Sequence, residues 1–165
     1  IMLSGESASG LYPLEAVSVM AKIAIRTEED LPNGDILRNK VFSLNNTTTD
    51  AISHATVQIA RQLDGAAIIT ATESGYTPRM VSKYRPQSSI IAVTPRAKTA
   101  RRVQLLWGVH PLLGSSHQNS DEMVKNSIQA AVDSKTIAHG DLVVITAGVP
   151  AGMSGTTNLI RVHTV

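Results

Sequence analysis

A short segment that follows the apolar run at positions 67–70 carries the residues best suited to binding a small anion. Its small and hydroxyl-bearing members are Thr72, Ser74, Gly75 and Thr77. We read Thr77 as the N-cap of a helix and Pro78 as its first residue, because a hydroxyl and a proline favour those positions. Such a turn directs several backbone N–H groups at one point. It predicts a phosphate-binding site; the alternative is a capped loop without a ligand, since Glu73 adds negative charge.

A second segment rich in glycine and hydroxyl groups, positions 148–158, follows the later apolar run DLVVITA. The residues that could close over a ligand are Gly152, Ser154, Gly155, Thr156 and Thr157. Ligands of open α/β sheets bind outside the carboxyl ends of the strands, so both segments can reach one pocket. We expect a flap over that pocket, and the alternative is a tight turn into an edge strand.

The remaining polar residues predict neither catalysis nor metal binding. We expect four cations to lie on solvated helix faces with some ion pairing, and one or two of them to steer an anion: Lys83, Arg85, Arg101 and Arg102. His54 and His163 lack metal-ligand spacing, so we interpret them as structural or surface residues. Glu6 by itself is weak evidence for a catalytic carboxylate. Because no Walker-type loop, Ser–His–Asp arrangement or usefully spaced carboxylate pair occurs, we predict no catalytic residue and no metal site.

The elements that position these residues alternate along the chain. Continuous apolar runs predict four strands, AAIIT, SIIAVT, GVHPLLG and DLVVITA, with helices between them. Such alternation is typical of a parallel sheet covered on both faces. The final run, NLIRVHTV, alternates in polarity and follows a link too short and too rich in glycine for a crossover helix. We therefore predict that the last strand is antiparallel to the strand before it.

Helix start signals divide the chain into three parts. A helix is expected from Pro13, and another from Thr47, where Asp50 three residues later resembles a capping box. Two further helices are expected from the pair Thr94–Pro95 and from Ser120. The helix after Thr47 should bury the stripe Ile52, Ala55, Ile59 and Leu63. Between these parts, TEEDLPNGD has turn chemistry, which gives residues 1–27, a linker at 28–46 and a domain at 47–165.

Composition sets the broad class. The chain has 165 residues, 42% of them hydrophobic and 17% charged, as in a globular domain. It has no apolar run near the ~18–20 residues of a membrane span. The absence of cysteine excludes disulfides and thiolate metal sites and fits a cytoplasmic location. A net charge of +2 and few aromatic residues give little support to nucleic-acid binding. The opening Ile1-Met2-Leu3 reads as the end of a strand from a longer protein.

Several long motifs resemble the pyruvate kinase family. MLSGESASGLYPLEAV resembles the segment at the end of that family's catalytic barrel, and the resemblance continues through KYRPQSSIIAVTP, WGVHPL and GDLVVITAGVPAGMSGTTNLIRVH. It covers nearly the whole chain and is similar to the C-terminal part of a bacterial enzyme. The resemblance implies an α/β fold, a three-layer α/β/α sandwich on a mixed five-stranded sheet whose last strand is antiparallel, preceded at 1–27 by a remnant of the barrel.

The family's activity is phosphoryl transfer from phosphoenolpyruvate to ADP, and its catalytic residues lie in barrel segments that would precede Ile1. The resemblance thus implies Mg²⁺ and K⁺ for the full-length enzyme, no cofactor for this segment, and an inactive isolated chain. It also implies an allosteric effector pocket, contact with the chain's own catalytic barrel, and a tetramer interface that favours self-association.

Carried over by position, Thr72, Ser74, Gly75 and Thr77 match the family's phosphate-gripping loop, and positions 148–157 match the loop that closes its effector pocket. Glu73 stands where effector-responsive relatives often have lysine. Positions 116–123 lack the tryptophan and arginine that grip a second phosphate, so a sugar monophosphate or nucleotide monophosphate is expected rather than a bisphosphate. Two alternatives stay open: a purely structural tetramerisation domain, and a stand-alone enzyme, which the missing catalytic set disfavours.

Overall fold

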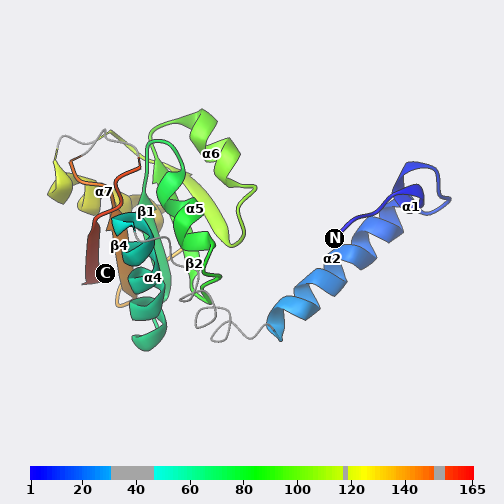
Figure 1. Ribbon diagram of the computed structural model, residues 1–165, viewed down its shortest axis with the longest axis horizontal. Coiled ribbons are helices and arrows are strands. Elements are labelled where there is room, and N and C mark those ends of the chain that lie inside the picture. Colours follow the sequence, from blue (N-terminus) through cyan, green and yellow to red (C-terminus); the bar gives the residue numbers. More distant parts are fainter. Residues whose placement is uncertain (31–46, 117–118, 151–154) are drawn as a thin grey trace. The chain divides into compact units, whose positions relative to one another are not determined.

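The computed structural model describes residues 1–30, 47–116, 119–150 and 155–165. The chain divides into two compact units, Ile1–Pro32 and Asn33–Val165 (Figure 1). Within the described ranges, no helix is long and apolar enough to cross a membrane.

The first unit consists of α1 (Gly5–Ala8) and α2 (Pro13–Glu29). Pro13 occupies the first turn of α2, with Tyr12 as the N-cap, as the sequence predicts. Residues 1–3, predicted to be the end of a strand from a longer protein, are not in a strand in this chain. A strand needs a hydrogen-bonded neighbour, and the described residues of this unit supply none. Neither helix has a buried residue, so the apolar side chains of α2 have no core within the unit.

The second unit is built on one five-stranded sheet. Its strands are β1 (Ala67–Ala71), β2 (Ser89–Thr94), β3 (Val109–Leu113), β4 (Leu142–Ala147) and β5 (Leu159–Thr164). Their order is β3-β2-β1-β4-β5, and every neighbouring pair is parallel except β4 and β5. The predicted mixed sheet with an antiparallel last strand is therefore confirmed. All five residues of β1 are buried, because this strand is central and covered on both faces.

Helices form the outer layers (Figure 1). They are α4 (Thr48–Gln62), α5 (Tyr76–Ser82), α6 (Ala97–Val103) and α7 (Ser120–Asp133). Consecutive strand residues point to opposite faces. Ile68 belongs to a core cluster with Val57 of α4 and Val81 of α5, whereas Ile69 belongs to a cluster with Met123 of α7. This alternation creates two cores, one on each side of the sheet, and so the three layers.

The apolar stripe predicted for α4 is not its most buried face, although Ile59 of the stripe packs against the core. Thr47 does cap the helix, its hydroxyl accepting from the Asp50 N–H at 3.3 Å. The buried face, however, carries mostly small and polar residues, which are Thr49, Asp50, Ser53, Thr56, Val57 and Ala60, while Leu63 is 47% exposed. The Thr56 hydroxyl donates a hydrogen bond to the Ile52 carbonyl at 2.8 Å. Polar groups with partners can be buried at little cost, so hydrophobicity alone misplaced this face.

Both predicted hydroxyl–proline helix starts are also wrong. Helix α5 begins at Tyr76 behind an N-cap at Gly75, which adopts the left-handed conformation with φ +81°. Helix α6 begins at Ala97 behind Arg96. The Thr94 hydroxyl instead accepts from the Arg96 N–H at 3.3 Å and forms a turn before the helix. Hydroxyl residues near helices stabilise turns as readily as they cap helices, and here the Thr94 hydroxyl stabilises a turn.

The two outer strands have different edges. The N–H of Gly114, just after β3, donates to the Thr94 carbonyl of β2, and the carbonyl of Gly108, just before β3, accepts from the Ile90 N–H of β2. The backbone groups of these even-numbered positions therefore face β2, and those of the odd-numbered positions face outward. Pro111 is at an outward position, and its nitrogen has no proton to donate. Strand β5, at the opposite end of the sheet, contains no proline.

Candidate functional site

The segment at residues 72–77, here called the effector turn, leaves the carboxyl end of the central strand β1. The Thr72 N–H still donates to Val93 of β2 at 3.0 Å. The Thr72 hydroxyl accepts from the Gly75 N–H at 3.0 Å, which closes the turn. Because that hydroxyl oxygen accepts, its own proton remains available for another acceptor. The turn is therefore a preformed loop whose donors lie at the carboxyl end of the central strand.

Glycine is required at position 75 for two reasons. Its φ of +81° lies in the region that other residues rarely adopt. In addition, a Cβ placed there would lie 2.7 Å from Cγ1 of Val103, closer than real Cβ atoms approach. The turn and helix α6 are thus in direct contact, and a larger residue would push them apart.

The turn meets the second predicted segment through a pair of buried hydroxyls. Thr77 Oγ1 lies 2.9 Å from Thr157 Oγ1, and the two residues are 6% and 1% exposed. Nearby, the Thr49 hydroxyl of α4 donates to the Gly155 carbonyl at 3.2 Å. The described part of the closing segment is therefore attached to both α4 and α5. The predicted residues Gly152 and Ser154 lie outside the described residues.

Helix α6 holds the turn from the other side, which the sequence reasoning missed. Arg96 Nε lies 2.6 Å from a carboxylate oxygen of Glu73. The Thr99 hydroxyl donates to the Glu73 carbonyl at 2.9 Å, and the Arg102 guanidinium donates to the Ser74 carbonyl. These contacts join residues 23 to 28 positions apart, so no local pattern could reveal them. The negative charge of Glu73 is partly neutralised where an anion would approach.

Lys83 forms an ion pair, as expected for some of the four cations singled out from the sequence, but its partner is buried and Lys83 itself is only partly exposed. Its ammonium lies 3.0 Å from Oδ1 of Asp50, whose side chain is fully buried. The Tyr84 hydroxyl donates to the same oxygen at 2.7 Å. Burial and the neighbouring Asp50 carboxylate raise the pKa of Tyr84 well above its usual range. An internal charge needs a partner, and Lys83 supplies it; this cluster joins the start of α4 to the end of α5.

The other residues singled out from the sequence have structural or surface positions. The Arg85 guanidinium lies 4.9 Å from the centre of the Trp107 ring, whereas Arg101 is exposed. His54 packs edge-on against Tyr84, with ring centres 5.3 Å apart, and His163 is half-buried in β5. Across the described ranges, no group of three or more histidine or carboxylate side chains could hold a metal ion.

Comparisons with known proteins agree with this architecture. The family model described as "Pyruvate kinase, alpha/beta domain" matches residues 50–163. Over all 165 residues, the chain is 50% identical to a pyruvate kinase of Geobacillus stearothermophilus and 46% identical to one of Clostridium acetobutylicum. It is 42% identical to a pyruvate kinase of Staphylococcus aureus. The chain covers 28%, 35% and 28% of these three proteins, respectively, and so spans about a third of their length or less.

Proposed function

The chain belongs to the pyruvate kinase family, and on that premise we propose that its α/β unit binds the phosphate of a small effector at the effector turn. The observation that carries the proposal is the buried pair of Thr77 and Thr157 hydroxyls, 2.9 Å apart. This pair joins the turn to the segment that would close over a ligand. A phosphate that contacts both the turn and the closing segment would stabilise the two together.

The donors for such a phosphate are present at one edge of the sheet. The Thr72 hydroxyl proton is available because its oxygen already accepts from Gly75. The Ser74 hydroxyl is half-buried and has no hydrogen-bond partner among the described residues. Hydrogen bonds to a charged phosphate contribute about 1.5–3 kcal/mol each. Since α5 has only seven residues, these hydroxyl groups rather than a helix dipole would supply most of the affinity.

The charges around the turn favour a single phosphate. Arg96 offsets Glu73, and Arg102 adds a positive charge beside the Ser74 carbonyl. The segment that would grip a second phosphate, residues 116–123, includes two positions outside the described residues. Its described members include exposed Asp121 and Glu122, whose charges oppose a second phosphate. The proposed effector is therefore a sugar monophosphate or a nucleotide monophosphate.

Ser74→Asp tests this proposal, because it places a fixed carboxylate where the phosphate would lie. Calorimetry with glucose 6-phosphate and AMP should detect binding to the parent chain and none to the variant. Ser18→Asp, an exposed change in the first unit, should bind like the parent. Failure of both ligands to bind the parent at about 10 mM, a binding free energy weaker than roughly −2.7 kcal/mol, would favour a domain that only assembles the enzyme.

The same measurement separates the effector classes. Fructose 1,6-bisphosphate should bind about as well as the monophosphates, within a few-fold. A hundredfold tighter bisphosphate, a difference of about 2.7 kcal/mol, would show that a second phosphate grip exists and that the monophosphate assignment is wrong.

The activity of the whole protein is also proposed. In a full-length enzyme, this chain would regulate phosphoryl transfer from phosphoenolpyruvate to ADP, a reaction that needs positioned Mg²⁺ and cationic clamps. In this family K⁺ would accompany the Mg²⁺. The chain alone is expected to be inactive. The apolar side chains that α2 exposes, among them Leu14 at 79% and Ile23 at 58% exposure, would be covered by the enzyme's own catalytic barrel.

A second role, self-association, is supported by the edge of the sheet. Strand β5 pairs with β4 on one side only, and Val162 on it is 43% exposed. An edge strand of this kind offers backbone groups to another chain. We expect a dimer through β5. Sedimentation velocity should show Val162→Lys as more dissociated than the parent; a parent that stays monomeric at high micromolar concentration would contradict this role.

A further inference from the structure

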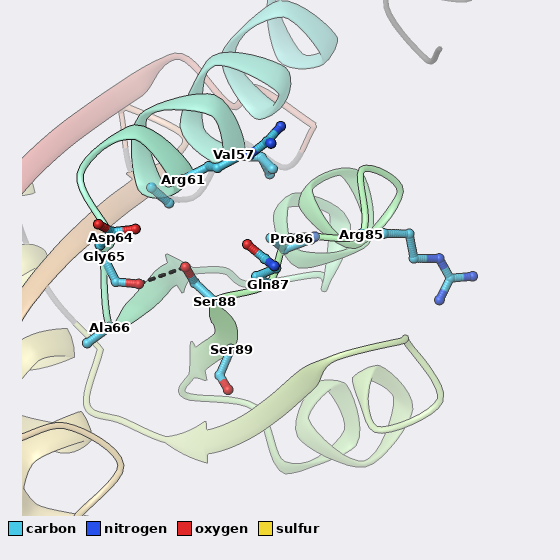
Figure 2. A pocket seen from close by; sticks show the side chains of 11 residues that line it. Val57, Arg61, Asp64, Gly65, Ala66, Arg85, Pro86, Gln87, Ser88 and Ser89 are labelled. Atoms are coloured by element: carbon cyan, nitrogen blue, oxygen red, sulfur yellow. Dashed lines mark hydrogen bonds between the residues drawn. The ribbon is translucent and has the colours of Figure 1, made fainter. Parts of the chain in front are cut away.

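A cavity of about 310 Å³ lies at the amino ends of β1 and β2, the edge of the sheet opposite the effector turn. Figure 2 shows it between the last turns of α4, the loop at Asp64 and Gly65, and the segment that leads into β2. Its volume is at the lower end of the ~300–1,000 Å³ typical of small-molecule sites. A cavity of this size would hold only a small ligand. None of its lining residues belongs to the effector turn.

The walls of the cavity are fixed by backbone contacts. The Ser88 hydroxyl donates to the Gly65 carbonyl at 2.7 Å, which ties the two loops together (Figure 2). The Gly65 N–H donates to Ala60 and the Ala66 N–H to Leu142, both at 2.8 Å. A site held in this way loses little freedom when a ligand enters, which favours binding.

Two opposite charges border the cavity without neutralising each other. Neither Arg61 nor Asp64 has an ion-pair or hydrogen-bond partner for its side chain among the described residues. Figure 2 shows why: the Arg61 side chain runs along α4 toward Val57, away from Asp64. Arg85 also lines the cavity, but its guanidinium points away from it and lies over Trp107. The cavity therefore has one cation and one anion, at different ends.

The lining of the cavity also includes an amide, the side chain of Gln87. In Figure 2 this side chain lies near the centre of the view, below the Arg61 side chain and to the right of Ser88. A carboxamide both donates and accepts, which is the hydrogen-bonding pattern of a peptide group. Val57 and Pro86 add an apolar surface.

From this arrangement we propose that the cavity binds a zwitterionic ligand of dipeptide size. The ammonium group pairs with Asp64, the peptide group with the Gln87 carboxamide, and the carboxylate with the planar donor fork of Arg61. A phosphate fits worse, because it would meet one exposed arginine and be repelled by Asp64. A neutral apolar ligand fits worse too, since it would desolvate both charges without pairing them. This site is independent of the proposed effector site.

The test is a titration of the ¹⁵N-labelled chain with L-alanyl-L-alanine to about 20 mM, followed by amide chemical shifts. We expect saturable shifts at Gly65, Ala66 and Ser88, with a dissociation constant in the low millimolar range. The N-acetylated dipeptide, which lacks the ammonium, and the C-terminal amide, which lacks the carboxylate, should each bind about fivefold more weakly, as expected for one exposed ion pair.

Two variants assign the charges. Arg61→Gln should bind the dipeptide and its amide equally, and Asp64→Asn should bind the dipeptide and its N-acetyl form equally. Asp64 has φ +48°, and asparagine tolerates that conformation, so the second variant should fold. Arg101→Gln, an exposed change on α6, should behave like the parent. Absence of saturable shifts at these amides, or equal binding of all three ligands to the parent, would overturn the proposal.

Discussion

The effector turn is held from two sides, and the two sides use the same kinds of bond in different surroundings. Toward the closing segment, the contact is the buried Thr77–Thr157 hydroxyl pair. The helix α5 that follows the turn is joined to α4 by a second buried cluster, Asp50 with Lys83 and Tyr84. Toward α6, the two arginine contacts are exposed, with the Arg96 side chain 67% accessible, whereas the Thr99 hydroxyl that donates to the Glu73 carbonyl is buried. Because water screens exposed charges, the buried side should determine whether the domain folds, and the exposed side should adjust how the turn binds.

The largest effect is expected for Asp50→Ala. The change removes a fully buried carboxylate and leaves Lys83 and the Tyr84 hydroxyl without it. Breaking a buried ion pair from one side costs about 3–5 kcal/mol, and since Lys83 is 27% exposed we expect about 3 kcal/mol. Denaturant unfolding measures it.

Asp121→Ala is the matched control, because it breaks the pair with Arg161 in which the aspartate is 92% exposed. It should lower the free energy of unfolding by less than about 1 kcal/mol. Equal losses for the two variants would remove the distinction between the buried and exposed sides.

Gly75→Ala should have an intermediate effect and tests the one tight contact on the α6 side. A left-handed conformation costs a non-glycine residue about 1–2 kcal/mol, and the new Cβ would also overlap Val103. We expect a loss of about 2–3 kcal/mol in unfolding experiments. Gly155→Ala also has a positive φ but nothing within 4 Å of its Cβ, so it should lose only the conformational part. Val103→Ala will itself lower stability, because Val103 is 2% exposed in the core. Its loss should be less than additive with that of Gly75→Ala, because the overlapping Cγ1 is removed, and additive with that of Gly155→Ala.

The smallest effect on stability is expected for Arg96→Gln. It breaks an exposed pair, so the free energy of unfolding should fall by less than about 1 kcal/mol, and the difference should shrink at high salt. If the proposed effector site is correct, phosphate affinity should nevertheless fall several-fold, because Glu73 is no longer neutralised. Calorimetry on Arg96→Gln and on the double variant Arg96→Gln, Glu73→Gln distinguishes these effects, since the double variant should regain affinity.

The inner strands could be predicted from the sequence because they are continuous apolar runs buried on both faces, as in β1 and β2. The edge strand β5 could be predicted from the alternating polarity of its residues. The buried face of α4 could not be predicted, because its polar residues depend on partners far along the chain. The buried carboxylate of Asp50 has its partners, Lys83 and Tyr84, 33 and 34 residues later in the chain. Likewise, hydroxyl and glycine types located the turn, but the contacts from α6 come from 23 to 28 residues away. Composition thus identifies candidate donors, and long-range packing decides their geometry.

Pro111 has a further consequence for how copies of this chain can join. A sheet with two open edges can polymerise without end, since each added copy presents a fresh edge. Here the outward nitrogen at the middle of β3 carries no proton, so that edge is a poor template, and β5 is the edge left to extend. Two copies that meet through β5 would consume both extendable edges and leave a β3 at each end of a ten-stranded sheet. If copies join through the sheet, assembly would stop at two copies, and Pro111 would then prevent the growth of a fibre.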